Sequence, residues 1–229
     1  RVLLAVPGAD RALGRRTGRH RRGELGVEVV VATETDPLWP GDAGPERAAG
    51  TGPSGDSPAR RLRLRPVRRE DLDMLERWWE TPEVQSHYNW FGYPPPGWLR
   101  RRFEENGMLG EEYGNLLVEL ADGTLVGDVS YHAVKHGPGG GSVAYNIGIT
   151  LLPEHRGRGL GAAAQRLLAD YLFAHTRVER VEAGTDVENV AEQRALEKAG
   201  FTREGVLRRA QFREGAFHDM ALYSRLRGE

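Results

Sequence analysis

The segment between residues 149 and 161, ITLLPEHRGRGLG, constrains the fold of this chain more than any other. It begins in the last residues of an expected strand, Val143–Leu152, and leads into an expected amphipathic helix, Ala162–Thr176. A strand that passes through a glycine-rich loop into a helix forms an anion site, because glycines let several backbone N–H groups converge and the helix N-terminus adds positive partial charge. Arg156 and Arg158 can add charge-assisted contacts. The pattern predicts a diphosphate held mainly by the main chain.

The loop also satisfies G-x-G-x-x-G/A, the dinucleotide fingerprint, over Gly157–Ala162. Two features argue against a dinucleotide. Its turn should follow the strand directly, yet Pro153–Arg156 intervenes. The acid that binds the ribose should close the next strand, whereas Glu179 and Glu182 flank the beginning of that strand. We therefore expect a different diphosphate ligand.

The composition of the chain changes near residue 60. Residues 1–23 carry seven Arg and one Asp, a net +6, and residues 24–59 carry seven acids and one Arg, a net −6. The Pro, Gly and Ser content after Asp36 predicts that residues 1–59 are largely linker or disordered, with one possible strand at Val27–Thr33. Because the two charged blocks cancel, nucleic-acid binding by the Arg-rich start is not favoured. The single domain is expected over residues 60–229.

Strands and helices are mixed within that domain, which predicts an α+β fold with a partly antiparallel sheet. The Asp122-Gly123 pair is a hairpin turn signal, and Gly200 is expected to cap a helix. The expected helices cover Glu70–Glu80, Leu99–Asn106 and Val190–Ala199, and an aromatic, Pro-rich loop covers His87–Trp98. The remaining expected strands are one that ends near Pro66, then Leu116–Leu120, Leu125–Tyr131, Val178–Val187, Arg208–Phe212 and Phe217–Leu226.

Composition excludes several classes of chemistry. The chain has no cysteine, which rules out disulfides, thiolate zinc sites and a cysteine nucleophile. Its formal net charge of −1 gives no overall attraction to nucleic acid or anionic membrane. The histidines have no metal-ligand spacing, so no metal is expected. No apolar run of about 18 residues is present, so we expect a soluble, cytoplasmic protein without a membrane partner.

Three motifs resemble one known family. Arg156-x-x-Gly159-x-Gly161 is similar to the Q/R-x-x-G-x-G/A pyrophosphate loop of the GNAT superfamily of acyl-CoA N-acyltransferases. Leu64–Asp71 resembles the opening strand and helix start of the branch that contains the ribosomal-protein N-acetyltransferases. Asn189 followed by Leu196–Phe201 (LEKAGF) is similar to the N-x-x-S…L-E-K-x-G-F segment of that branch.

The resemblance implies a three-layer α/β/α fold whose mostly antiparallel sheet splays open at the acyl-CoA site. It implies an N-acetyltransferase that moves an acetyl group from acetyl-CoA to a primary amine of a small molecule or a protein N-terminus, by direct attack in a ternary complex. The backbone near Ile149, Leu151 and Leu152 would bind the pantetheine arm. Asn189 would contact a pantetheine amide, although it could equally be a plain helix N-cap. The loop residues implied in diphosphate binding are Arg156, Gly157, Arg158, Gly159, Leu160 and Gly161.

Proton transfer is where the sequence departs from the family. The serine often found three residues after the Asn is Glu192, and the tyrosine found seven residues after it in other branches is Leu196. Asn146 stands where this branch often has Glu. Asp128 and His132, which strand alternation places on one face with Ser130, are candidate bases, and Glu192 could act if protonated. The substitutions motivate an alternative, a catalytically weak CoA-binding or sensing module of the same fold.

The acceptor side of the family is built by the segment between the first strand and the hairpin. Here that segment supplies Tyr88, Trp90 and Tyr93, whose aromatic faces suit an apolar or cationic amine. Together with Asn146 they are the expected substrate-binding residues. The same aromatic surface could instead form a homodimer contact.

Overall fold

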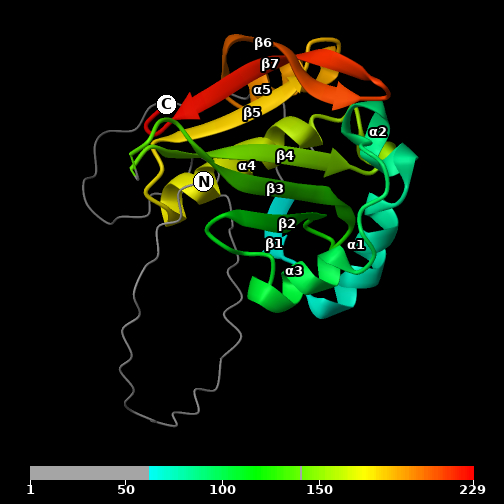
Figure 1. The fold of residues 1–229 in the computed structure, drawn as a ribbon. Helices are drawn as coiled ribbons and strands as arrows, with labels where there is room; N and C mark the ends of the chain where they lie inside the picture. The colour runs from blue at the N-terminus through cyan, green and yellow to red at the C-terminus, as the bar shows by residue number, and fades with distance from the viewer. Residues whose placement is uncertain (1–61, 140) are drawn as a thin grey trace, which may run out of the picture.

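The computed structural model describes residues 62–139 and 141–229, and in them a seven-stranded sheet forms the centre of the molecule (Figure 1). The strand order is β1-β2-β3-β4-β5-β7-β6, and every pair is antiparallel except β4 with β5. The strands are β1 Leu62–Pro66, β2 Tyr113–Leu120, β3 Leu125–Lys135, β4 Val143–Leu151, β5 Arg180–Asp186, β6 Thr202–Arg213 and β7 Ala216–Leu226.

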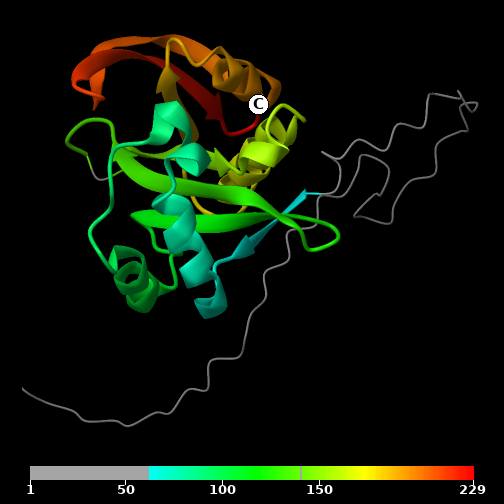
Figure 2. The ribbon, with the colours of Figure 1, turned by 90° about the vertical axis from the view of Figure 1, so that its right-hand side faces the viewer.

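Helices cover both faces of the sheet, as the turned view in Figure 2 shows. The helices are α1 Leu72–Trp79, α2 Pro82–Asn89 and α3 Trp98–Asn106 on one side, and α4 Leu160–His175 and α5 Val190–Lys198 on the other. Short 3₁₀ turns, Arg69–Asp71 and Pro153–His155, precede α1 and α4. The mixed three-layer fold expected from the sequence is confirmed. No helix in the described part of the chain is long and apolar enough to cross a membrane.

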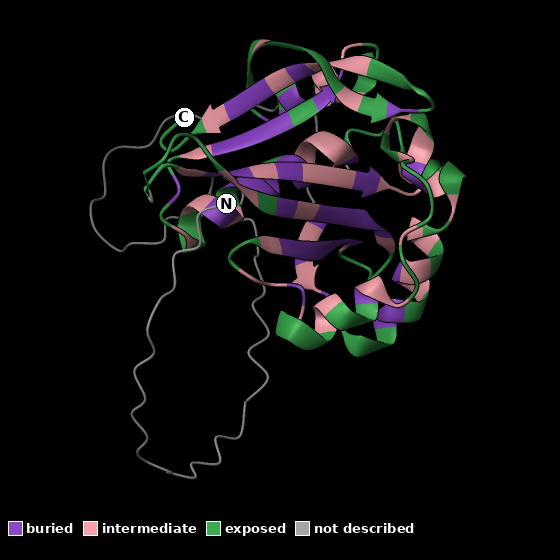
Figure 3. Cartoon of the chain, in the orientation of Figure 1, coloured by how far each residue is buried: buried purple, intermediate pink, exposed green. Residues whose placement is uncertain are grey.

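Two apolar cores hold the layers together. The larger one lies between the sheet and α4, where Leu168 and Leu172 are fully buried, as their helical spacing predicts. The smaller one lies under α1 and α3 around Leu75, Leu99 and Leu117. Burial is therefore concentrated in the central strands, while β6 and the outer faces of the helices are exposed (Figure 3).

The sheet splits between β4 and β5. Their pairing begins at Tyr145 opposite Val181 and ends at Ile147 opposite Ala183, although β4 continues to Leu151 and β5 to Asp186. The last four residues of β4 consequently have a strand neighbour only on the β3 side. The splayed sheet expected from the family resemblance is confirmed.

The local sequence signals are confirmed where they are strong. Gly123 has φ +88° in the β2–β3 turn, and Gly200 has φ +92° after α5. The predicted loop His87–Trp98 is wrong at its start, because α2 extends through Asn89. The expected strand Arg208–Phe212 is too short, since β6 begins at Thr202 and bulges twice, which breaks its side-chain alternation. The expected strand at Val27–Thr33 and the segment 1–59 lie outside the described residues.

Candidate active site

A cavity of about 480 Å³ lies where β4 and β5 separate. Its walls come from both splayed strands, from the glycine-rich loop before α4, and from α2 and α5. The lining includes Ile147, Gly148, Ile149, Thr150 and Leu151 of β4, Thr185 of β5, Arg156, Gly157, Gly159 and Gly161 of the loop and first turn of α4, Val84, Gln85, Ser86, Tyr88 and Asn89 of α2, and Asn189, Glu192, Arg194 and Lys198 beside or on α5.

The glycine-rich loop leaves a row of amides without protein acceptors. His155 and Arg156 donate their N–H groups to the carbonyls of Leu152 and Pro153. Within the described chain, the amides from 157 to 162 have no such acceptor. Gly157 and Gly159 have φ +73° and +78°, and these left-handed conformations turn the loop into the first turn of α4. Free amides at a helix N-terminus bind an anion such as a diphosphate.

The exposed edge of β4 offers a second set of backbone groups. Leu152 donates its amide to Val126 of β3, so this amide points away from the cavity. By alternation, Ile149 and Leu151 direct their N–H and C=O groups into the gap. Both carbonyls already accept hydrogen bonds, from Asn89 Nδ2 at 3.2 Å and from Arg156 Nε at 2.9 Å. Their amides therefore remain as the donors that an extended ligand could use.

The Arg156 side chain links β4 to α2 in the cavity wall. Besides the Leu151 carbonyl, its guanidinium bonds to the carbonyls of Glu83 and Val84 in α2, at 3.0 and 2.6 Å. All three acceptors are backbone oxygens, so in this arrangement its side chain does not point at a diphosphate. Arg158 is exposed and makes no hydrogen bond to the described residues.

Positive charge on α5 was missed by the sequence analysis. Arg194 and Lys198 both line the cavity, four residues apart on one face of the helix. Their spacing was visible in the sequence, but nothing there showed that this face of α5 turns toward the gap.

The start of α5 brings a cap and a carboxyl group together. Asn189 Oδ1 accepts a hydrogen bond from the Glu192 amide at 3.2 Å, so the N-cap role weighed for Asn189 is present. The Glu192 side chain lines the cavity. Burial raises the pKa of this carboxyl to about 7, although a hydrogen bond with Gln165 opposes the shift. Glu192 can therefore carry a proton near neutral pH.

Asp128 and His132 lie away from the cavity lining. They share one face of β3, as alternation predicts, opposite Thr150 and Asn146 of β4. Asp128 is buried and accepts a hydrogen bond from Asn115 at 2.8 Å, and burial raises its pKa to about 6. His132 is exposed. None of Asp128, His132 and Asn146 is among the residues that line the cavity.

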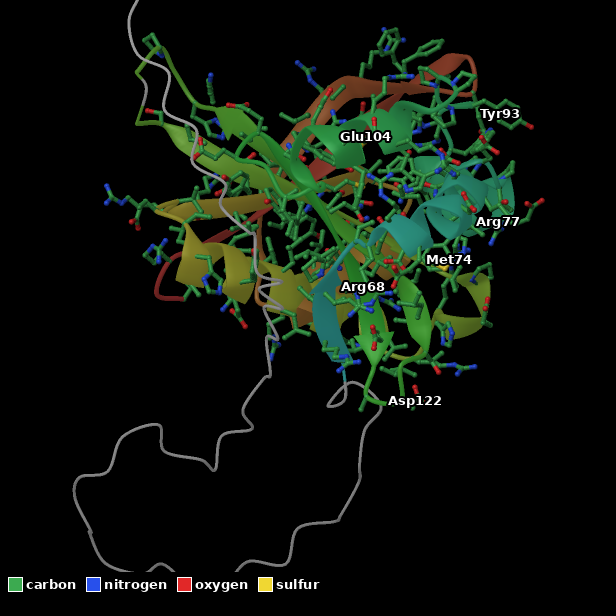
Figure 4. All side chains as sticks on the ribbon, turned by 90° about the horizontal axis from the view of Figure 1, so that it is seen from below. Arg68, Met74, Arg77, Tyr93, Glu104 and Asp122 are labelled. Atoms are coloured by element: carbon green, nitrogen blue, oxygen red, sulfur yellow. The ribbon has the colours of Figure 1, made fainter. Side chains whose placement is uncertain are left out.

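The aromatic segment is divided between cavity and surface. Tyr88 lines the cavity from α2, and its hydroxyl donates to the Glu188 carbonyl at 3.2 Å. Trp90 and Tyr93 pack edge to face, with ring centroids 5.2 Å apart, but neither lines the cavity. Tyr93 is 77% exposed and lies at the periphery of the molecule (Figure 4).

A splayed β4–β5 pair beside a loop of free amides is the arrangement expected of an acyl-CoA-dependent N-acyltransferase. Comparison with known families agrees: residues 61–202 match the acetyltransferase (GNAT) domain, and the chain belongs to this family. Acetyl-CoA is its co-substrate.

The chain is similar in sequence and in fold to several acetyltransferases. An uncharacterized N-acetyltransferase of Bacillus licheniformis, p20, is 27% identical over 74% of this chain and 94% of its own length. The ribosomal-protein-serine acetyltransferase of Escherichia coli K12 is 25% identical over 56% of this chain and 69% of its own length. Among solved structures, spermidine N-acetyltransferase of Vibrio cholerae, in complex with CoA and spermine, has a TM-score of 0.61 and 22% identity over 72% of this chain and 95% of that one.

Proposed function

We propose that the chain transfers an acetyl group from acetyl-CoA to the α-amino group of a protein N-terminus, by direct attack within the cavity. In this step the neutral amine nitrogen bonds to the thioester carbonyl carbon, the carbon–sulfur bond breaks, the nitrogen loses one proton to water, and the departing thiolate takes up a proton. The observation that carries the proposal is the single cavity that unites the free loop amides, the open β4 edge and Glu192.

The backbone supplies binding and orientation. The loop amides from 157 to 162 would hold the diphosphate, with Arg158, Arg194 and Lys198 adding charge. The amides of Ile149 and Leu151 would fix the pantetheine arm and polarise the thioester carbonyl. If one of them acts as an oxyanion donor, it would lower the activation barrier by about 3 kcal/mol. Holding both substrates in one cavity would lower the barrier further by removing their translational freedom.

Glu192 is our candidate proton donor to the thiolate. Its pKa of about 7 suits a group that must be protonated before transfer and must exchange its proton with solvent afterwards. It occupies the position where this branch of the family often carries a serine. Asp128 is too deeply buried to reach an amine directly, so we assign it to holding Asn115 rather than to proton transfer.

The chemistry of the α2 wall favours a protein N-terminus over a polyamine. A polyamine carries several positive charges and would need carboxylates along its site. The α2 residues on the cavity are Val84, Gln85, Ser86, Tyr88 and Asn89, none of them acidic.

A thiol-release assay tests the proposal. The full chain is incubated with acetyl-CoA and, in separate reactions, with peptides that bear a free or a blocked α-amino group, with spermidine and with free lysine. We expect turnover with the free peptides and little with the blocked peptides or spermidine. Preference for spermidine would overturn the acceptor assignment. Binding of acetyl-CoA with no turnover on any amine would instead favour a CoA-sensing module, the alternative that the replacements at Glu192 and Leu196 motivate.

A further inference from the structure

A completely buried arginine lies beside the cavity. Arg213 is the last residue of β6, and its side chain has no exposed surface. Its guanidinium donates to Asp186 Oδ2 at 2.7 Å and to Gln211 Oε1 at 2.9 Å. Removing an arginine and an aspartate from water is costly, and a buried pair is retained without loss only where its geometry and hydrogen bonds are good. The bonds to Asp186 and Gln211 hold this guanidinium in place, while its Nε has no hydrogen-bond partner among the described residues.

Three elements meet at Arg213. The ring of Tyr88, which lines the cavity from α2, lies 5.4 Å from the guanidinium carbon. Asp186 ends β5, and its second oxygen accepts the Glu188 amide at 2.8 Å. His218 of β7 lies 3.2 Å from the Asp186 carboxylate. One guanidinium thus connects α2, the free end of β5 and the β6–β7 hairpin, and Figure 1 shows α2 beside the end of that hairpin.

The contact between α2 and the hairpin has a second, weaker component. His87 and Glu214 form a pair 3.2 Å apart, but both side chains are more than half exposed. Exposed pairs of this kind contribute little. The buried Arg213 network is therefore the stronger of these two contacts between α2 and the hairpin.

We infer that Arg213 is a positioning residue for the acceptor amine. It holds α2, through Tyr88, and the end of β5, through Asp186, which are two walls of the cavity in which the amine reaches the thioester. The inference rests on the proposed function, because it requires that the acceptor enter on the α2 side. It assigns no contact between Arg213 and either substrate. Its effect is carried by the placement of Tyr88 and the end of β5.

Steady-state kinetics on Arg213→Lys and Arg213→Met test the inference. We expect the KM for the peptide acceptor to rise about tenfold or more, because a displaced wall misplaces the amine, while the KM for acetyl-CoA stays within about twofold. Arg208→Met is the matched control: Arg208 is exposed on the same strand and makes no hydrogen bond to the described residues, so its variant should behave like the parent.

Two further measurements keep the test independent of stability. Hydrogen exchange should accelerate in residues 82–89 and 211–218 of the Arg213 variants and stay at the parent rate in α4. Tyr88→Leu should raise the same acceptor KM, and adding Arg213→Met to it should raise that KM little further, because both residues act through one contact.

The two possible failures are distinguishable. If the parent turns over no peptide, the proposed function fails. If the parent is active and the Arg213 variants keep its acceptor KM, or raise the KM of acetyl-CoA equally, the positioning role is overturned. A lowered melting temperature with parental KM values would identify Arg213 as a stabilising residue only, which also overturns it.

Discussion

At the scale of single residues, Glu192 makes the most direct prediction about proton transfer. Changing Glu192 to Gln should lower kcat by about a hundredfold, because an amide cannot give a proton to the thiolate. In the parent, kcat should fall as pH rises through about 7, where the carboxyl loses its proton, and this alkaline limb should be missing in the variant. Glu188→Gln is the control, since Glu188 is exposed and lies four residues earlier, before α5 begins. A variant with the parental pH profile would exclude Glu192 as the donor.

The same shifted pKa makes a prediction about stability. The folded chain holds the Glu192 proton up to about pH 7, whereas the unfolded chain releases it near the ordinary value of 4.5. The folded state therefore binds more protons in this window, and the contribution of Glu192 to the free energy of unfolding falls as pH rises through it. The free energy of unfolding of Glu192→Gln, measured by urea unfolding and taken relative to that of the parent, should therefore increase by about 1–3 kcal/mol from about pH 4 to pH 8. An unchanged difference at the two pH values would contradict the burial of this group.

Gly159 makes a third prediction at this scale. Changing it to Val should abolish acetyl-CoA binding, because a β-branched residue resists φ +78° and its side chain would stand against the phosphates. No protein atom lies within 4 Å of the added Cβ, so a clash inside the fold cannot explain the loss. Gly123→Val is the control, with φ +88° in the distant β2–β3 turn. Calorimetry that finds parental binding in Gly159→Val would show that the loop does not hold the diphosphate.

At the scale of elements, α2 forms one wall of the cavity, and Arg156 of the diphosphate loop holds it in place through hydrogen bonds. Arg156→Ala should speed hydrogen exchange in residues 82–89, because it removes the bonds to the Glu83 and Val84 carbonyls. Arg158→Ala should leave that exchange unchanged and weaken acetyl-CoA binding in a salt-dependent way, as a surface charge does. If both variants weaken binding equally and neither affects α2, Arg156 is a phosphate ligand after all.

The limits of sequence reasoning are also clearest for these elements. The strand, loop and helix around residues 143–176 were predictable because periodicity and glycine chemistry are local. The start of α2 carried a local signal too, Pro82 at the first helical position, which the aromatic run after it obscured. The role of the Arg156 side chain was not predictable, since its partners lie 72 and 73 residues away. Likewise, alternation placed Asp128 and His132 on one face of β3 but could not show whether their side chains reach the cavity.

At the scale of the whole molecule, every residue to which the proposed reaction assigns a role lies in the described domain. Its first strand begins at Leu62, and the cavity is lined by residues between Val84 and Lys198. Both apolar cores are likewise built within residues 62–229. The match to the acetyltransferase domain starts at residue 61, close to the boundary expected from composition. A chain without residues 1–59 thus keeps every strand, both cores and all the cavity residues found in the described part of the chain.

We therefore expect a variant lacking residues 1–59 to fold and to bind acetyl-CoA like the full chain. Because a ligand that binds only the folded state stabilises it by mass action, acetyl-CoA should raise the melting temperature of both proteins by the same amount. Circular dichroism melting with and without acetyl-CoA measures this. An insoluble or destabilised variant would mean that residues 1–59 pack on the domain. A stable variant with weakened binding would instead mean that they contribute to the acyl-CoA site, and the cavity described here would then be only part of it.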